Sequence, residues 1–138
     1  MSAYITKSVE ETMLLAAELA KQARGGEVYA FFGGMGMGKT AFIKGFVKGI
    51  GNGSDVSSPT FALVNDYGGR PRICHFDMYR VESWDDLCST GFFDYMDGDS
   101  ILLIEWSENI EAALPDDAVR ITISMGESEN ERIIEIAN

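Results

Sequence analysis

The chain has 138 residues, of which 46% are hydrophobic and 24% charged, a composition typical of a globular protein and not of a disordered one. It contains 22 acidic residues and 11 Lys and Arg, which give a net charge of −11. A protein that binds nucleic acid by itself needs a basic surface, so this charge argues against that function. Two cysteines are too few for a disulfide framework, and no apolar run approaches the roughly 18 residues of a membrane-spanning helix. We therefore expect one cytoplasmic domain over residues 1–138, without membrane association.

The first half of the chain alternates between helix and strand signals. A capping box at Ser8–Glu11 begins a predicted helix that extends to Arg24. An apolar strand is predicted at 27–32, and a second amphipathic helix runs from Thr40 to the glycines at 49–53.

The second half of the chain is dominated by strand signals. Two strands are predicted at 61–64 and 73–76, around a turn at 68–71. The continuous apolar run at 100–105 is typical of a buried central strand. The remaining predicted elements are short helices at 84–87 and 108–113 and a terminal hairpin with strands at 119–124 and 132–136.

A phosphate-binding loop lies between the first strand and the second helix. Residues 33–40 match the pattern G-x-x-x-x-G-K-[ST] in full, and the strand and helix stand on the expected sides of it. The alternative is a chance glycine loop, which the agreement of motif and context disfavours. Lys39 is predicted to contact the β- and γ-phosphates of a nucleoside triphosphate, and the Thr40 hydroxyl to hold Mg²⁺. The predicted fold is therefore an α/β, P-loop NTPase-like, three-layer domain with a mixed, mainly parallel central sheet.

Two carboxylates follow strands that should end beside this loop. Glu105 closes the most hydrophobic strand, where a carboxylate can hold Mg²⁺; the alternative is a polar strand end. Asp77 closes the strand at 73–76 and is predicted to position the metal or orient the attacking water, with a turn-capping role nearly as plausible. His75 is the only histidine, and a structural role is favoured over a catalytic one.

The type of nucleotide and reaction is constrained by what the sequence lacks. No Asn-Lys-x-Asp run is present to recognise guanine, so ATP is favoured over GTP. No Arg-rich insertion is present to form the lid of a small-molecule kinase. The hydroxyl-rich loop at 57–60 is interpreted equally well as a nucleotide-sensing switch or as a solvated connection.

Four segments taken together resemble the TsaE family, the bacterial ATPases needed to make threonylcarbamoyladenosine in tRNA. These segments are Gly33 to Thr40, Val56-Ser57-Ser58-Pro59-Thr60-Phe61, His75-Phe76-Asp77-Met78-Tyr79-Arg80 and Ile104-Glu105-Trp106. The resemblance implies a protein that binds ATP with Mg²⁺, hydrolyses it weakly, and works with the TsaD and TsaB proteins. It also implies that tRNA is contacted only indirectly, through TsaD.

The resemblance assigns roles to particular residues. It implies catalytic roles for Lys39, Asp77 and Glu105, and metal binding by Thr40 and Glu105. The implied nucleotide-binding residues are Thr12, Gly33, Gly34, Met35, Gly36, Met37, Gly38, Lys39, Thr40, Thr60, Trp106 and Arg132.

The chain departs from the family pattern at three positions. Gly34 and Met37 replace an acidic and a small residue in the phosphate loop, and Ser107 replaces the usual proline after Glu-Trp. A small P-loop kinase and a nucleotide-sensing regulatory module remain as alternative functions.

Overall fold

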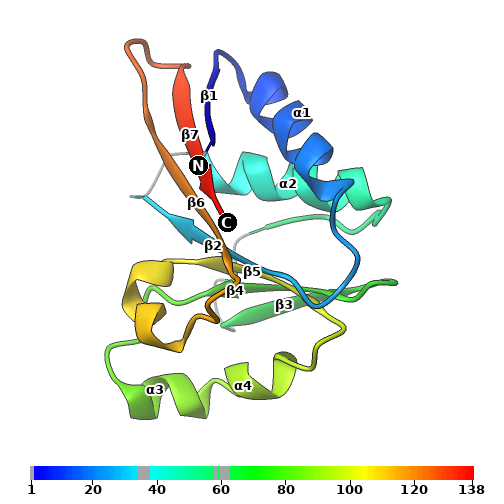
Figure 1. Cartoon of the computed structure of the whole chain (residues 1–138), viewed down its shortest axis with the longest axis vertical. Coiled ribbons are helices and arrows are strands. Elements are labelled where there is room, and N and C mark those ends of the chain that lie inside the picture. The colour runs from blue at the N-terminus through cyan, green and yellow to red at the C-terminus, as the bar shows by residue number, and fades with distance from the viewer. Residues whose placement is uncertain (1, 34–37, 58, 60–62) are drawn as a thin grey trace.

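The structure of the chain, a computed structural model, describes residues 2–33, 38–57, 59 and 63–138 (Figure 1). The strands are β1 Ser2–Thr6, β2 Val28–Phe32, β3 Val64–Gly68, β4 Ile73–Asp77, β5 Ile101–Glu105, β6 Val119–Met125 and β7 Arg132–Ala137. The helices are α1 Val9–Ala20, α2 Lys39–Ile50, α3 Trp84–Ser89, α4 Phe92–Tyr95 and the 3₁₀ helix η1 Ser107–Ala113.

The strands of the described residues form one seven-stranded sheet in the order β1-β7-β6-β2-β5-β4-β3. Neighbouring strands within the central group β6-β2-β5-β4 are parallel. The pairs β1–β7, β7–β6 and β3–β4 at the two edges are antiparallel. This mixed sheet with a parallel centre confirms the predicted fold class, and it places the carboxyl ends of β2, β5 and β4 at the same edge.

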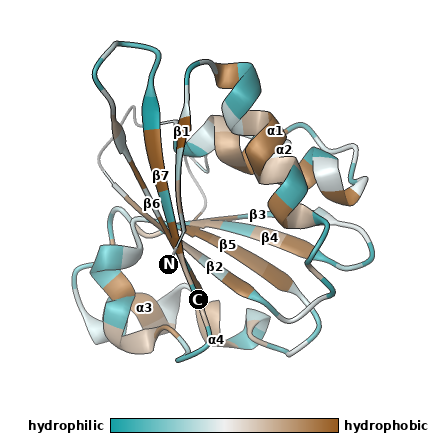
Figure 2. Ribbon diagram, turned by 45° about the horizontal axis from the view of Figure 1, so that its top comes forward, coloured by the Kyte–Doolittle hydropathy of each residue, from teal (hydrophilic) through white to brown (hydrophobic). Residues whose placement is uncertain are grey.

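Helices cover both faces of the sheet, which confirms the predicted three layers (Figures 1 and 2). The alternation of side chains along β5 explains why: Ile101 and Leu103 pack under α1 and α2, whereas Leu102 and Ile104 pack under α3, α4 and η1. Because both faces are covered, every residue of β5 is buried.

The helices α1 and α2 pack unusually closely on one face. A Cβ placed on Gly45 would lie 2.2 Å from the Met13 carbonyl oxygen, and one on Gly49 would lie 2.7 Å from the Cα of Ala17. Glycine at these two positions therefore allows the backbones of the two helices to approach each other.

Several elements differ from the sequence predictions. The strand β1 and the helix α4 were not predicted, and α1 ends at Ala20, four residues before the predicted end. β1 carries no alternating pattern because four of its five residues are exposed; its pairing with β7 holds it. The strand predicted at 61–64 has its first two residues outside the described ones, and β3 continues to Gly68.

Candidate nucleotide-binding site

Two glycines fix the ends of the phosphate loop. Gly33 follows β2 with a φ of +124°, and a Cβ at this position would lie 2.5 Å from the Ile123 carbonyl oxygen on β6. Gly38, with a φ of +90°, precedes α2 and has no side chain to cap that helix. The positive end of α2 therefore stands at the end of the loop without a side-chain cap from Gly38, as an anion-binding site requires.

The Lys39 side chain contacts the first glycine of the phosphate-loop motif and makes no ion pair within the described residues. Its Nζ donates a hydrogen bond of 2.9 Å to the Gly33 carbonyl oxygen and lies 4.7 Å from the centre of the Trp106 ring. Lys39 is buried, and among the described residues no carboxylate lies within ion-pairing distance of it. Among the described residues, its ammonium group contacts a carbonyl oxygen and an aromatic face, and it interacts with the Asp77 carboxylate at longer range, which leaves it available to an anion.

The two predicted carboxylates are neighbours at the ends of adjacent parallel strands. Asp77 on β4 and Glu105 on β5 are register partners, as expected from their positions after apolar runs. Burial raises the pKa of the Asp77 carboxyl above its ordinary value, and repulsion from Glu105 adds to this effect. A hydrogen bond of 2.9 Å from the Tyr79 N–H works in the opposite direction. Two carboxylates in this relation favour a cation between or beside them.

Glu105 is further tied to a histidine. The Nε2 of His75 lies 2.6 Å from Glu105 Oε2, and the other ring nitrogen, Nδ1, lies 2.8 Å from the Tyr67 hydroxyl. The sequence favours a structural role for His75 and indicates no role for Tyr67. His75 stands two residues before Asp77, which places the two side chains on the same face of β4, and this spacing was the available signal. No signal in the sequence pointed to Tyr67, because β3 was predicted to end before it.

Trp106 marks a sharp turn after β5. It has a φ of +58°, the only positive φ of a non-glycine residue in the described part of the chain, and η1 begins immediately after it. Its ring lies 5.0 Å from that of Tyr79, and the Ser107 hydroxyl donates a hydrogen bond of 2.8 Å to the Ile104 carbonyl. The turn thus places the Trp106 ring between Lys39 and Tyr79, where it can contact a bound molecule.

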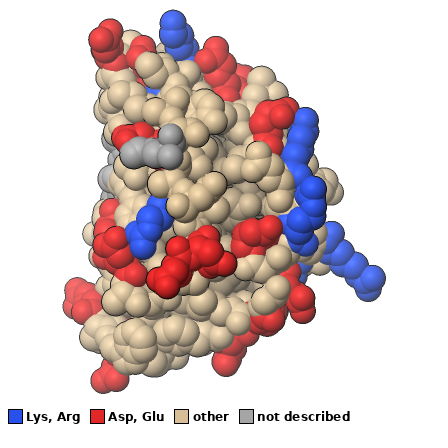
Figure 3. Space-filling view, in the orientation of Figure 1, with Lys and Arg blue, Asp and Glu red and all other residues tan. Residues whose placement is uncertain are grey.

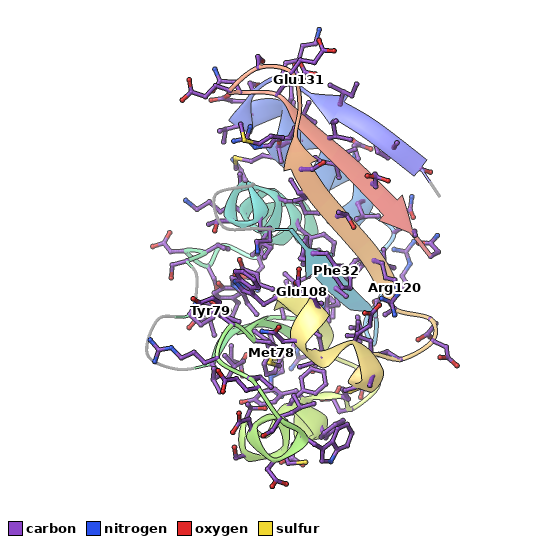
Figure 4. All side chains as sticks on the ribbon, turned by 90° about the vertical axis from the view of Figure 1, so that its left-hand side faces the viewer. Phe32, Met78, Tyr79, Glu108, Arg120 and Glu131 are labelled. Atoms are coloured by element: carbon purple, nitrogen blue, oxygen red, sulfur yellow. The ribbon has the colours of Figure 1, made fainter. Side chains whose placement is uncertain are left out.

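Figure 4 shows that η1 lies beside the end of β2. Phe32, at the end of β2, and Glu108, in η1, lie close together in this view. Glu108 Oε2 is 3.5 Å from the Gly33 amide nitrogen, so its contact with the loop is long and weak. Glu131 lies far from them at the tip of the β6–β7 hairpin.

The other predicted nucleotide-binding residues fall into three groups. Arg132 lies beside the loop, since a Cβ on Gly38 would be 3.7 Å from its Nε. Thr12 is buried in α1, and its hydroxyl shares a hydrogen bond of 2.7 Å with that of Thr6. Five residues lie outside the described ones: Gly34, Met35, Gly36, Met37 and Thr60.

The arrangement suits Mg²⁺ held together with a nucleotide. The described residues contain no group of three or more His, Cys, Asp or Glu side chains that could hold a metal by themselves. Mg²⁺ commonly takes only one or two protein ligands and completes its shell with water and phosphate oxygens. Thr40, at the second position of α2, and Glu105, at the end of β5, fit this limited role.

A strand, a glycine loop and a helix beginning Lys-Thr, beside a strand that ends in a carboxylate, define a domain of the P-loop NTPase-like class. A family model described as "Threonylcarbamoyl adenosine biosynthesis protein TsaE" matches residues 6–134. The chain belongs to the TsaE family.

Individual relatives agree with this assignment. A protein of Bacillus subtilis (strain 168), named tRNA threonylcarbamoyladenosine biosynthesis protein TsaE, is 38% identical over 128 residues, which cover 91% of this chain and 80% of the relative. A protein of the same name from Treponema pallidum (strain Nichols) is 31% identical over 119 residues, covering 86% and 88%. The crystal structure of Bacillus subtilis YdiB is similar in fold, with a TM-score of 0.75 and 31% identity over 96% of this chain and 82% of that one.

Proposed function

We propose that this protein binds ATP with Mg²⁺ and hydrolyses it slowly, as an accessory protein in the synthesis of threonylcarbamoyladenosine in tRNA. The observation that carries the proposal is the meeting of Lys39, Asp77 and Glu105 around the phosphate loop of a TsaE-family chain. The names of the relatives supply the pathway, and the geometry supplies the chemistry of the site.

Each residue has a role in this proposal that follows from its position. Lys39 binds and stabilises the γ-phosphate, exchanging its hydrogen bond with the Gly33 carbonyl for phosphate oxygens. Thr40 and Glu105 hold Mg²⁺, which neutralises charge on the phosphate oxygens when it is bound. Asp77, whose raised pKa favours proton acceptance, orients the attacking water. Trp106 covers the nucleotide beside Lys39.

The charge of the protein favours an indirect relation to tRNA. Asp and Glu side chains are spread over the face that Figure 3 shows, with Lys and Arg side chains interspersed among them. The net charge of −11 opposes tight binding to a polyanion. We therefore propose that the TsaD and TsaB proteins hold the tRNA and that this protein acts on them.

A cytoplasmic location follows from the same proposal, since ATP and tRNA are both found there. Among the described residues, no helix combines the length and apolar character needed to cross a bilayer.

The test is ATP hydrolysis by the purified protein with and without Mg²⁺, alone and in the presence of a TsaB–TsaD complex. We expect slow hydrolysis that requires Mg²⁺ and is stimulated by the complex. Glu105→Gln should abolish the Mg²⁺-dependent part, and Asp77→Asn should slow turnover more than it weakens ATP binding. The matched control is Glu111→Gln, because Glu111 is an exposed acid of η1 whose carboxylate pairs with Arg120 and not with a residue of the proposed site.

Other outcomes would point to the alternatives. Transfer of labelled γ-phosphate to a metabolite or a protein, and not to water, would favour a small kinase. ATP binding without turnover, even with TsaB–TsaD present, would favour a nucleotide-sensing module.

A further inference from the structure

A chain of hydrogen bonds runs from Glu105 away from the phosphate loop, through two neighbouring strands. Glu105 Oε2 on β5 meets His75 Nε2 on β4 at 2.6 Å, and His75 Nδ1 meets the Tyr67 hydroxyl on β3 at 2.8 Å. The Tyr67 hydroxyl also lies 3.1 Å from the carbonyl oxygen of Ser57, in the segment between α2 and β3. His75 is fully buried and Glu105 nearly so, so water does not compete for the contact between them, whereas the contact of Tyr67 with Ser57 is exposed.

The positions of the protons follow from counting donors and acceptors. A tyrosine hydroxyl has one proton, so it can donate to His75 or to the Ser57 carbonyl, but not fully to both. Glu105 Oε2 is a carboxylate oxygen and accepts, so a singly protonated His75 carries its proton on Nε2 and donates it to Glu105. Nδ1 then accepts from Tyr67 at 2.8 Å. The Ser57 carbonyl has two lone pairs, of which one accepts a hydrogen bond of 2.9 Å from Asn65 Nδ2, so it is a second, competing acceptor for the Tyr67 proton at 3.1 Å.

This arrangement occupies one oxygen of Glu105, since His75 contacts Oε2. Oε1 is the oxygen left to take up a cation, on a side chain whose orientation His75 has already fixed. A carboxylate ordered in advance loses less conformational entropy when it takes up a cation.

We propose that His75 and Tyr67 are positioning residues for Glu105: they hold its Oε2, they orient Oε1 for the metal, and this hold depends on the Ser57 carbonyl, which competes for the Tyr67 proton. The proposal rests on the proposed role of Glu105 in holding Mg²⁺. It assigns a function to the buried His75 and the half-buried Tyr67, neither of which the proposed reaction uses. If the Ser57 carbonyl moves, its competition for the Tyr67 proton changes. The hydrogen bond from Tyr67 to His75 then changes in strength, and with it the hydrogen bond from His75 that orients Glu105.

The first experiment determines the tautomer of His75 by ¹⁵N NMR of the nucleotide-free protein. The chain contains one histidine, so the ring signals of the untagged protein need no assignment. We expect a single proton on Nε2, and we expect Tyr67→Phe to shift the Nδ1 signal because that nitrogen loses its donor. A proton on Nδ1 alone would overturn the proposal, since Nε2 would then have none to donate to Glu105.

The second experiment titrates Mg²⁺ and measures how much it strengthens ATP binding, which gives both the ratio of ATP affinities with and without the metal and the half-saturating Mg²⁺ concentration. We expect Tyr67→Phe and His75→Leu to raise this concentration by roughly tenfold, because removing the hydrogen-bond partners of a metal ligand typically weakens metal binding to this extent. His75→Gln retains an N–H donor and should restore part of the effect, which a purely structural role for the ring would not predict. Tyr95→Phe, a tyrosine on the other face of the sheet, is the control.

The outcomes separate this inference from the function on which it rests. If Mg²⁺ strengthens ATP binding equally in the wild type and in Tyr67→Phe, the positioning role is wrong and the proposed function stands. If Mg²⁺ has no effect on the wild type, Glu105 holds no metal and both are wrong. Because His75→Leu alters a buried site, its folding is checked by circular dichroism, and the Phe and Gln variants test the proposal independently of it.

Discussion

The close approach of α1 and α2 gives a prediction whose magnitude follows from the structure. In Gly45→Ala, the new Cβ would lie 2.6 Å from the Cα of Met13 and 2.2 Å from its carbonyl oxygen. Carbon atoms in contact prefer a separation of about 3.5–4.0 Å, so the helices would have to separate by about 1 Å. The atoms in the way belong to the backbone of α1 and cannot rotate aside, unlike the end of a flexible side chain.

The cost can be estimated from two opposing contributions. Overpacking of this kind typically destabilises a core by about 1–3 kcal/mol, and the rigid backbone contact places this case at the upper end. Alanine gains about 1 kcal/mol over glycine in a helix interior, which leaves a net loss of about 2 kcal/mol. For a chain of this size, the midpoint of thermal unfolding should fall by about 8 °C.

The assay is urea unfolding followed by circular dichroism, with thermal unfolding as a second measurement. The matched control is Gly53→Ala, because a Cβ at Gly53 has no atom within 4 Å and its φ is not in the left-handed region. Its unfolding free energy should stay within about 0.5 kcal/mol of the wild type. A Gly45→Ala protein as stable as the wild type would refute the reasoning, since it would mean that α1 and α2 do not approach as closely as described.

Three further predictions concern the site and the core. Lys39→Ala should weaken ATP binding by about 10–100-fold, because charge-assisted hydrogen bonds contribute about 1.5–3 kcal/mol each. Calorimetric titration of the protein with ATP measures this loss, and Lys48→Ala, which changes an exposed lysine of the same helix, is the control. Equal losses of affinity in the two variants would contradict the prediction. Ser107→Ala should lower the unfolding free energy by about 1 kcal/mol, because the buried hydroxyl loses its bond to the Ile104 carbonyl, and an unchanged urea midpoint would disprove this. Burial raises the pKa of Tyr29 to about 12 from 10.0, so above pH 10.0 the unfolded state loses this proton first and stability falls as the pH rises towards 12. One pKa unit corresponds to about 1.36 kcal/mol, so between pH 9 and pH 12 the unfolding free energy of the wild type should fall by about 2–3 kcal/mol more than that of Tyr29→Phe. Equal falls in the two proteins would show that Tyr29 does not cause the decline.

The elements that sequence analysis identified correctly carry strong local signals. The strand β2 and the helix α2 on either side of the glycine motif, the apolar run of β5 and the terminal hairpin each follow from spacing and residue type over fewer than about 20 residues. The elements it missed lack such signals: β1 is almost wholly exposed, and α4 has only four residues. Strand β3 was expected to end before Tyr67, because Asn65 and Asp66 are typical of loops, yet its pairing with β4 extends it to Gly68.

The candidate site divides in the same way. The sequence by itself determined the candidate site residues, because Lys39 and Thr40 stand at fixed places in a short motif, and Asp77 and Glu105 each close an apolar strand. Only the tertiary structure decided how these residues meet, because the order β2-β5-β4 places segments side by side that lie up to about 70 residues apart along the chain. The hydrogen-bonded chain from Glu105 through His75 to Tyr67 depends on the register of three strands, and register is set by long-range pairing that no local pattern encodes.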